Sequence, residues 1–166
     1  MNIITVLITV SNKEYLQDAL LSVKNQVYKD FDFLVMVDEH NDKELYGYVV
    51  ELINIIFADE KLNIKIERIM GNGTAARVTN KGFELAETEW VTYWGDDIVT
   101  LDAMQEVVKA ILQNGDGLYV SGYFLFDEKG RKVDVKHLLC AKQTKACIME
   151  NLDLYIEEFL LVNYKL

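Results

Sequence analysis

The chain has 166 residues, enough for one domain with a real hydrophobic core and short for two. It is 51% hydrophobic, and its net charge of -10 argues against nucleic-acid binding, which needs a basic face. No apolar run approaches the ~20 residues of a membrane span, and Cys140 and Cys147 lie in no metal-binding spacing, so we expect a cytoplasmic protein with reduced thiols.

Four strands are predicted in the region up to residue 94. The first two, "NIITVLITV" and "DFDFLVMVD", are continuous apolar runs, which is typical of strands buried on both faces. The third, "LNIKIERI", alternates apolar with charged residues, so we expect it half exposed and near an edge of the sheet. The fourth is the aromatic stretch from Trp90 to Trp94, which stops at Gly95 and two adjacent carboxylates, Asp96 and Asp97 (the aspartate pair).

Helices are predicted wherever apolar residues recur at helical spacing. The expected helical segments are 13–26, about 43–58, the segment after the glycine turn at 71–73, and the segment that begins near Thr100. Asn41 or Asp42 is expected to cap the second of these helices, and Thr100 the fourth, which should stop near Gly115. The stretch "GLYVSGYFLFDEKGRKVDV" predicts one long strand, a turn at 128–130 and a partner strand, before a C-terminal helix.

This alternation of strands and helices predicts the fold class. It favours an α/β, doubly wound, mostly parallel sheet with helices on both faces and a C-terminal hairpin plus helix. In such sheets ligands bind beyond the carboxyl ends of the strands. Those ends carry the polar segment Thr9 to Asn12, then Asp38, and the aspartate pair, so we expect these groups to converge on one rim.

The aspartate pair predicts a bound cation. One carboxylate would suffice to cap the next helix, and two at a partly buried rim repel unless a cation lies between them and an anion. Mg²⁺ and Mn²⁺ bind through one or two carboxylates and complete their shell with water and phosphate oxygens. The pair therefore predicts a metal bridge to a pyrophosphate, with a plain helix cap as the alternative.

Two stretches carry a family resemblance. "VLITVSNKEYLQDALLSVKNQVYKDFDFLVMVD" resembles the opening of the family 2, GT-A type glycosyltransferases, whose pattern contains "YL..AL.S...Q.Y.DFE" and a second strand ending in aspartate. "NKGFELAETEWVTYWGDD" is similar to their "N.G...A.GEYI...DDD" segment. The resemblance covers residues 3–105 and implies a single GT-A type domain, in which 1–105 is the nucleotide-sugar-binding half and 106–166 a short, divergent acceptor-side half.

The resemblance also implies a reaction and a set of residues. Family members transfer a sugar from a nucleotide-diphosphate donor, usually UDP-linked, with inversion, here to an unknown glycan, lipid or protein acceptor. Asp38 matches the aspartate that accepts uracil N3–H, and the aspartate pair matches the signature that holds the ribose-diphosphate and Mn²⁺ or Mg²⁺. The expected nucleotide-sugar-binding residues are Thr9, Ser11, Asn12, Asp38, Arg77 and Asp96, and the expected metal ligands are Asp96 and Asp97.

Two positions depart from the family pattern. The acidic signature usually has a further aspartate two residues earlier, where this chain has Trp94. The segment "ENLDLYIEEF" resembles a degenerate copy of the catalytic-base segment "EDyDLwlR", with Asn151 in the base position. Asparagine cannot accept a proton, so Glu150 or Asp153 is the expected base, and a solvated amphipathic helix is the alternative.

Other functions fit parts of the sequence. "GNGTAAR" formally matches the dinucleotide-binding fingerprint, but it follows a charged strand and leaves the aspartate pair unexplained. A nucleotidyltransferase would need a glycine- and arginine-rich loop where the chain has "TVSNKE". A non-catalytic nucleotide-sugar-binding or assembly module would explain Trp94 and Asn151. The apolar tail "FLLVNYKL" would suit a contact with a second copy of the chain, or packing on its own sheet.

Overall fold

The computed structural model describes residues 2–70, 74–95, 97–115, 118–120, 123–126, 132–136 and 160–163. The strands are β1 (Ile4–Val10), β2 (Asp32–Asp38), β3 (Asn63–Ile69), β4 (Trp90–Tyr93), β5 (Leu118–Val120), β6 (Tyr123–Phe126), β7 (Lys132–Lys136) and β8 (Leu160–Asn163). The helices are α1 (Leu16–Lys24), α2 (Leu45–Ile56), α3 (Ala75–Leu85) and α4 (Ala103–Asn114).

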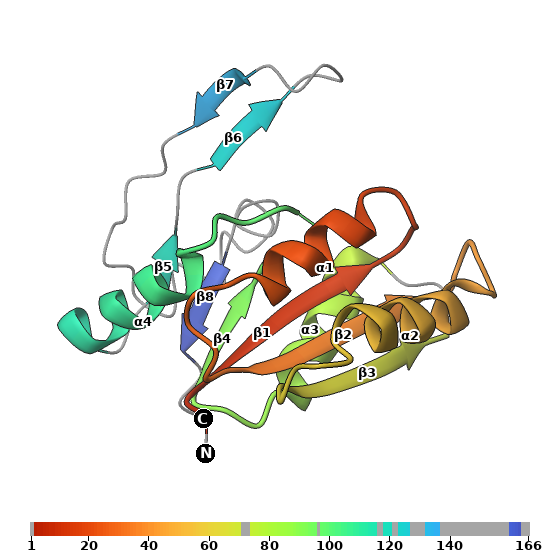
Figure 1. The fold of residues 1–166 in the computed structure, drawn as a ribbon, viewed down its shortest axis with the longest axis horizontal. Helices are drawn as coiled ribbons and strands as arrows, with labels where there is room; N and C mark the ends of the chain where they lie inside the picture. The colour runs from red at the N-terminus through yellow and green to blue at the C-terminus, as the bar shows by residue number, and fades with distance from the viewer. Residues whose placement is uncertain are drawn as a thin grey trace.

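The main sheet has the order β3-β2-β1-β4-β8-β5 (Figure 1). Strands β1 to β4 are parallel, and β8 runs antiparallel to both β4 and β5. The chain moves from β1 outward to β2 and β3, then returns to the other side of β1 to form β4. The reversal puts the topological switch point between β1 and β4, which is where open α/β sheets bind ligands. The predicted mostly parallel sheet is confirmed, and β3 lies at its edge as expected.

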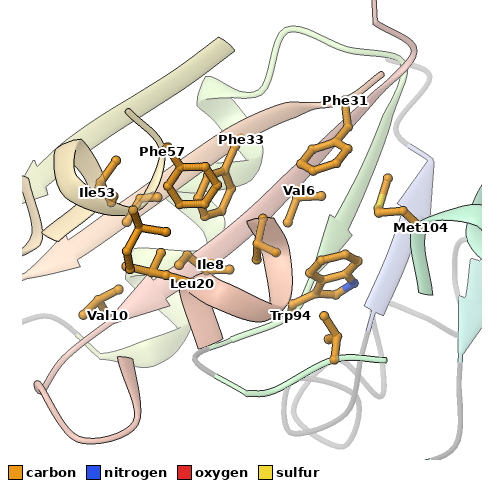
Figure 2. Close-up of a cluster of buried hydrophobic side chains, with 14 of the residues drawn as sticks. Val6, Ile8, Val10, Leu20, Phe31, Phe33, Ile53, Phe57, Trp94 and Met104 are labelled. Carbon is orange, nitrogen blue, oxygen red and sulfur yellow. The ribbon is translucent and has the colours of Figure 1, made fainter. Parts of the chain in front are cut away.

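Helices cover both faces of this sheet, so the fold is doubly wound. One buried cluster joins β1, β2 and β4 to α1, α2 and α4, and a second joins the opposite face to α3. Alternate residues of β1 serve the two clusters: Val6 and Ile8 enter the first, and Leu7 enters the second. In Figure 2 the rings of Phe33 and Phe57 lie together in the first cluster, with centroids 5.6 Å apart. Fully burying a side chain of this size contributes about 1.5–3 kcal/mol.

Both predicted helix caps were wrong. Glu44 occupies the N-cap position of α2, and Asp42 Oδ1 instead accepts from the Glu44 amide (2.9 Å) in the turn before the helix. Asp102 occupies the N-cap position of α4. Thr100 lies two residues before that position, and its carbonyl accepts from the Ala103 amide (3.1 Å) in the turn that precedes the helix. Gly115 follows α4 with φ 72°, so the predicted stop is confirmed.

The part after α4 differs most from the prediction. The single long strand expected there is divided into β5 and β6, which belong to different sheets. The predicted hairpin is confirmed as the antiparallel pair of β6 and β7. The apolar tail contributes β8, which pairs with β4 and β5, so this part of the tail packs on the chain's own sheet. The predicted C-terminal helix lies outside the described residues.

Candidate functional site at the carboxyl edge of the sheet

The carboxyl ends of β1 and β4 meet at the switch point. Leu7 pairs with Tyr93 in the ladder, and the Trp94 amide donates to the Leu7 carbonyl (3.0 Å). Two residues beyond Leu7, the hydroxyl of half-buried Thr9 lies 2.9 Å from the Tyr93 hydroxyl. This side-chain hydrogen bond joins the two strands where the segment carrying Asp97 leaves the sheet.

The segment after β4 turns sharply at Gly95. Gly95 has φ 58°, which favours glycine, and the Asp97 amide donates to the Trp94 carbonyl (3.3 Å). A Cβ atom on Gly95 would lie 3.7 Å from the Tyr93 hydroxyl and 3.9 Å from Asp97 Oδ2, so both groups flank this glycine. Asp97 itself is exposed at the edge. Asp96 lies outside the described residues.

Trp94 occupies the place of the missing third aspartate, and its surroundings differ from those of a ligand-binding residue. It is 3% exposed and belongs to the buried cluster of Val6 and Met104, as Figure 2 shows. The chain therefore has a core side chain where the family pattern has a carboxylate.

Asp38 ends β2 at the same edge of the sheet. The side chain is half-buried, and Oδ1 accepts from the His40 amide (3.0 Å), which fixes one side of the carboxylate. The next residue, Glu39, is a site-supporting residue that the sequence analysis missed. It is 7% exposed, its Oε1 accepts from the Tyr46 amide (3.1 Å), and its Oε2 forms an ion pair with Arg68 Nε. These contacts join β2 to the start of α2 and to β3.

The turn after β1 brings the remaining polar candidates to this edge. Ser11 and Asn12 are exposed, and Asn12 Oδ1 accepts from the amide two residues later (2.9 Å). Lys13 Nζ lies 2.7 Å from Asp42 Oδ2, so the turns after β1 and β2 are joined. The hydrogen bond from the Lys13 ammonium holds the pKa of the Asp42 carboxyl below its usual range, and the same bond raises the pKa of Lys13.

The other predicted residues lie farther along the chain. Arg77 is exposed in the first turn of α3, and its amide donates to the Thr74 hydroxyl (3.3 Å), which caps that helix. Because α3 follows β3, its N-terminus also lies at the carboxyl edge. The predicted bases Glu150 and Asp153 lie outside the described residues, as do the glycines of the 71–73 turn.

The described donors fit a hard cation only in an open site. Within the part of the chain that the structure describes, no group of three or more His, Cys, Asp or Glu side chains could hold a metal ion by itself. Asp97 supplies carboxylate oxygens, the ligand type that Mg²⁺ and Mn²⁺ prefer. Such a cation would take one or two carboxylates here and complete its shell with water and phosphate oxygens.

No helix among the described residues is both long and apolar enough to cross a bilayer.

Comparison with known proteins identifies the family. An uncharacterized glycosyltransferase of Haemophilus influenzae is 27% identical over 135 residues, which cover 80% of this chain and 52% of that relative. Staphylococcus aureus TarS 1-349 in complex with UDP superposes with a TM-score of 0.61 at 22% identity, covering 81% of this chain and 38% of that one. The mannosyltransferase PcManGT from Pyrobaculum calidifontis, in complex with GDP-Man and Mn2+, gives 0.60 at 16% identity, covering 72% and 35%.

The two solved structures share the fold, and this chain spans only about half of the curated relative's length. The model of the glycosyl transferase family 2 matches residues 5–163, nearly the whole sequence. The chain therefore belongs to glycosyl transferase family 2.

Proposed function

We propose that the chain binds a UDP-sugar at the carboxyl edge of its sheet and transfers the sugar, with inversion, to an acceptor not yet identified. The observation that carries the proposal is the convergence of Thr9, Tyr93 and Asp97 at the switch point between β1 and β4. Family membership supports the same chemistry. Two structural neighbours were solved in complex with UDP and with GDP-Man and Mn2+, which supports a nucleotide as the ligand.

Asp38 is proposed to recognise the base. Its carboxylate is half-buried at the end of β2 and held by the His40 amide, so it presents an acceptor in a fixed orientation. A carboxylate accepts a hydrogen bond from uracil N3–H and offers no donor of its own. Ser11 and Asn12 are exposed in the turn after β1, which the Lys13–Asp42 ion pair joins to the turn after β2.

The hydroxyl pair at the switch point can serve the donor as well. Only one of the Thr9 and Tyr93 hydroxyls can donate within their shared hydrogen bond. The other has a proton to give to a third group, such as a ribose or phosphate oxygen. Arg77, in the first turn of α3, adds a positive charge near the helix N-terminus, where anions are favoured.

Asp97, together with Asp96, is proposed to hold Mn²⁺ or Mg²⁺. When bound, the cation would neutralise the charge that develops on the departing diphosphate. The protein itself holds Asp97 at the switch point, beside Gly95 and the Tyr93 hydroxyl.

Calorimetric titration of UDP, with and without Mn²⁺, tests the donor site. We expect binding that requires the metal and weakens at least about tenfold in Asp97→Asn, because one of the few charged ligands is lost. The matched control is Asp102→Asn, an exposed aspartate in the N-cap position of α4 that makes no side-chain cap bond, and it should bind as the wild type does. No binding under any condition would refute the proposal. Equal loss in both variants would show that Asp97 has no specific role.

A second assay separates an enzyme from a binding module. Slow hydrolysis of a UDP-sugar without acceptor requires catalysis, whereas a nucleotide-sugar-binding module would bind UDP and release no sugar. Glu150 and Asp153 are the proposed bases, so Glu150→Gln and Asp153→Asn are the variants to compare. The one that abolishes hydrolysis and retains UDP binding identifies the base. Activity retained by both would refute both assignments.

A further inference from the structure

Ser22, in α1, and Gln26, just after the helix, have buried polar side chains that form several hydrogen bonds. Ser22 is 7% exposed and Gln26 is 1% exposed. The Ser22 hydroxyl donates to the Ala19 carbonyl (2.7 Å), and the Gln26 Nε2 amide donates to the Ser22 carbonyl (2.9 Å). Each also makes hydrogen bonds to a distant part of the chain, the segment that follows Asp97.

Residues 99–104 are held against α1 by these side chains. Ser22 Oγ accepts from the Val99 amide (3.2 Å). Gln26 Nε2 donates to the Thr100 carbonyl (2.7 Å), and Gln26 Oε1 accepts from the Met104 amide (2.9 Å). In Figure 1 the green segment between β4 and α4 runs past the end of α1 where these bonds form. A backbone bond from the Val27 amide to the Leu101 carbonyl (2.9 Å) adds to them.

This segment needs partners from outside itself. Residues 97–100 belong to no helix or strand, so their backbone groups lack the regular pairing of a helix or ladder. A buried amide such as Gln26 offers both a donor and an acceptor, and it satisfies Thr100 and Met104 at once. An apolar residue of similar size would fill the same space and remove the acceptor of the Met104 amide, which is costly, while the Thr100 carbonyl would keep only the Ala103 amide (3.1 Å). The polar identity of Gln26 is therefore explained by the loop it holds.

Asp97 lies between two anchored points. Before it, Trp94 is buried and its amide is bonded to the Leu7 carbonyl of β1. After it, Val99 is buried and its amide is bonded to Ser22. Few residues separate the two anchors, so a shift of the second anchor moves Asp97 directly.

We propose that Ser22 and Gln26 are positioning residues that hold Asp97 at the switch point for the cation and the diphosphate. This inference rests on the proposed function. The residues act through the backbone of 99–104 and do not themselves touch the donor.

The test compares Gln26→Glu and Ser22→Ala with a matched control, Gln17→Glu, where the glutamine is exposed in the first turn of α1. Gln26→Glu keeps the size of the side chain but places a carboxylate oxygen against the Thr100 carbonyl. The measured quantity is the ratio of the UDP dissociation constants without and with Mn²⁺, at a temperature where circular dichroism shows every variant folded. We expect this ratio to fall about tenfold in Gln26→Glu, less in Ser22→Ala, and to stay unchanged in Gln17→Glu.

Hydrogen exchange of the Asp97, Val99 and Met104 amides provides the second readout, and it should rise in both variants while the amides of β1 stay protected. A residue that only supports the core would lower thermal stability and leave the metal ratio of the folded protein unchanged, which would overturn the positioning role alone. If the wild-type protein itself shows no metal-dependent UDP binding, the proposed function is overturned, and so is the role assigned to Asp97. If Gln26→Glu fails to fold, Ser22→Ala decides by the same ratio.

Discussion

The contribution of the Glu39–Arg68 ion pair, next to Asp38, to the stability of the fold can be tested by mutation. Its two partners differ in exposure: the side chain of Glu39 is 4% exposed and that of Arg68 is 43% exposed. Glu39 also accepts the amide of Tyr46 (3.1 Å), and the Arg68 guanidinium lies 5.7 Å from the centroid of the Tyr46 ring. Removing exposed Arg68 should therefore lower the free energy of unfolding more than removing buried Glu39.

The variants Arg68→Met and Glu39→Gln measure this difference. Removing one partner of a buried pair costs about 3–5 kcal/mol. Here the arginine is already half hydrated and the Tyr46 amide still reaches the carboxylate, so we expect Arg68→Met to lose about 2–3 kcal/mol. Glu39→Gln leaves an arginine that water can solvate and an amide oxygen that can still accept from Tyr46, so it should lose about 1 kcal/mol. The double variant should lose less than the sum, because no buried charge is left unpaired.

Urea denaturation followed by circular dichroism gives the free energies of unfolding. The control is Lys65→Met on the same strand, where the pair with Glu67 spans 3.5 Å and the two side chains are 45% and 37% exposed. A surface pair of this kind is worth about 0–1 kcal/mol. If Arg68→Met costs no more than Lys65→Met, the carboxylate of Glu39 does not depend on its partner and the reasoning fails.

Three smaller predictions concern other contacts of the same fold. Gly82→Ala would place a Cβ atom 2.5 and 2.8 Å from the two methyl groups of the fully buried Leu7. Overpacking of about 1–3 kcal/mol should outweigh a helix gain of about 1 kcal/mol, and a more stable variant in urea would contradict this. Gly95→Ala must adopt φ 58°, which costs an alanine about 1–2 kcal/mol, so we expect a lower melting temperature and weaker metal-dependent UDP binding. Lys13→Met should raise the pKa of Asp42, because the Lys13 hydrogen bond lowers it in the folded protein. That pair stabilises above the unfolded-state pKa of Asp42 and loses its effect as pH falls through the folded-state value; an unchanged Asp42 titration by NMR would contradict the assignment.

The strands of the parallel region were predictable because burial on both faces leaves a clear local pattern. The apolar runs that became β1 and β2 are of this kind, and the charged alternation of Lys65, Glu67 and Arg68 marked β3 as an edge strand. Periodicity says nothing about partners distant in sequence, however. It could not show that β8 would pair with β4 and β5, or that β5 and β6 would enter different sheets.

The residues of the candidate site that lie at the ends of strands could be predicted from the sequence. Thr9 and Asp38 were expected at the carboxyl edge, and the structure places both there. Gln26 was overlooked because a glutamine in a predicted helix is usually solvated, and its burial depends on a loop 74 residues away. The error at Thr100 has a similar origin: threonine is a good helix cap, but residue 100 lies in a turn before α4, and its carbonyl is bonded to Gln26, far away in the sequence.

The charges at this edge bear on the metal ion proposed for the donor site. Two of its cations are already compensated, in the pairs Lys13–Asp42 and Arg68–Glu39. Asp97 adds negative charge next to the place proposed for the diphosphate. A diphosphate bound next to this carboxylate would be repelled, because like charges interact strongly at short range. A divalent cation held by the proposed ligands would reverse that sign locally, and a chain of net charge -10 could then hold a polyanion.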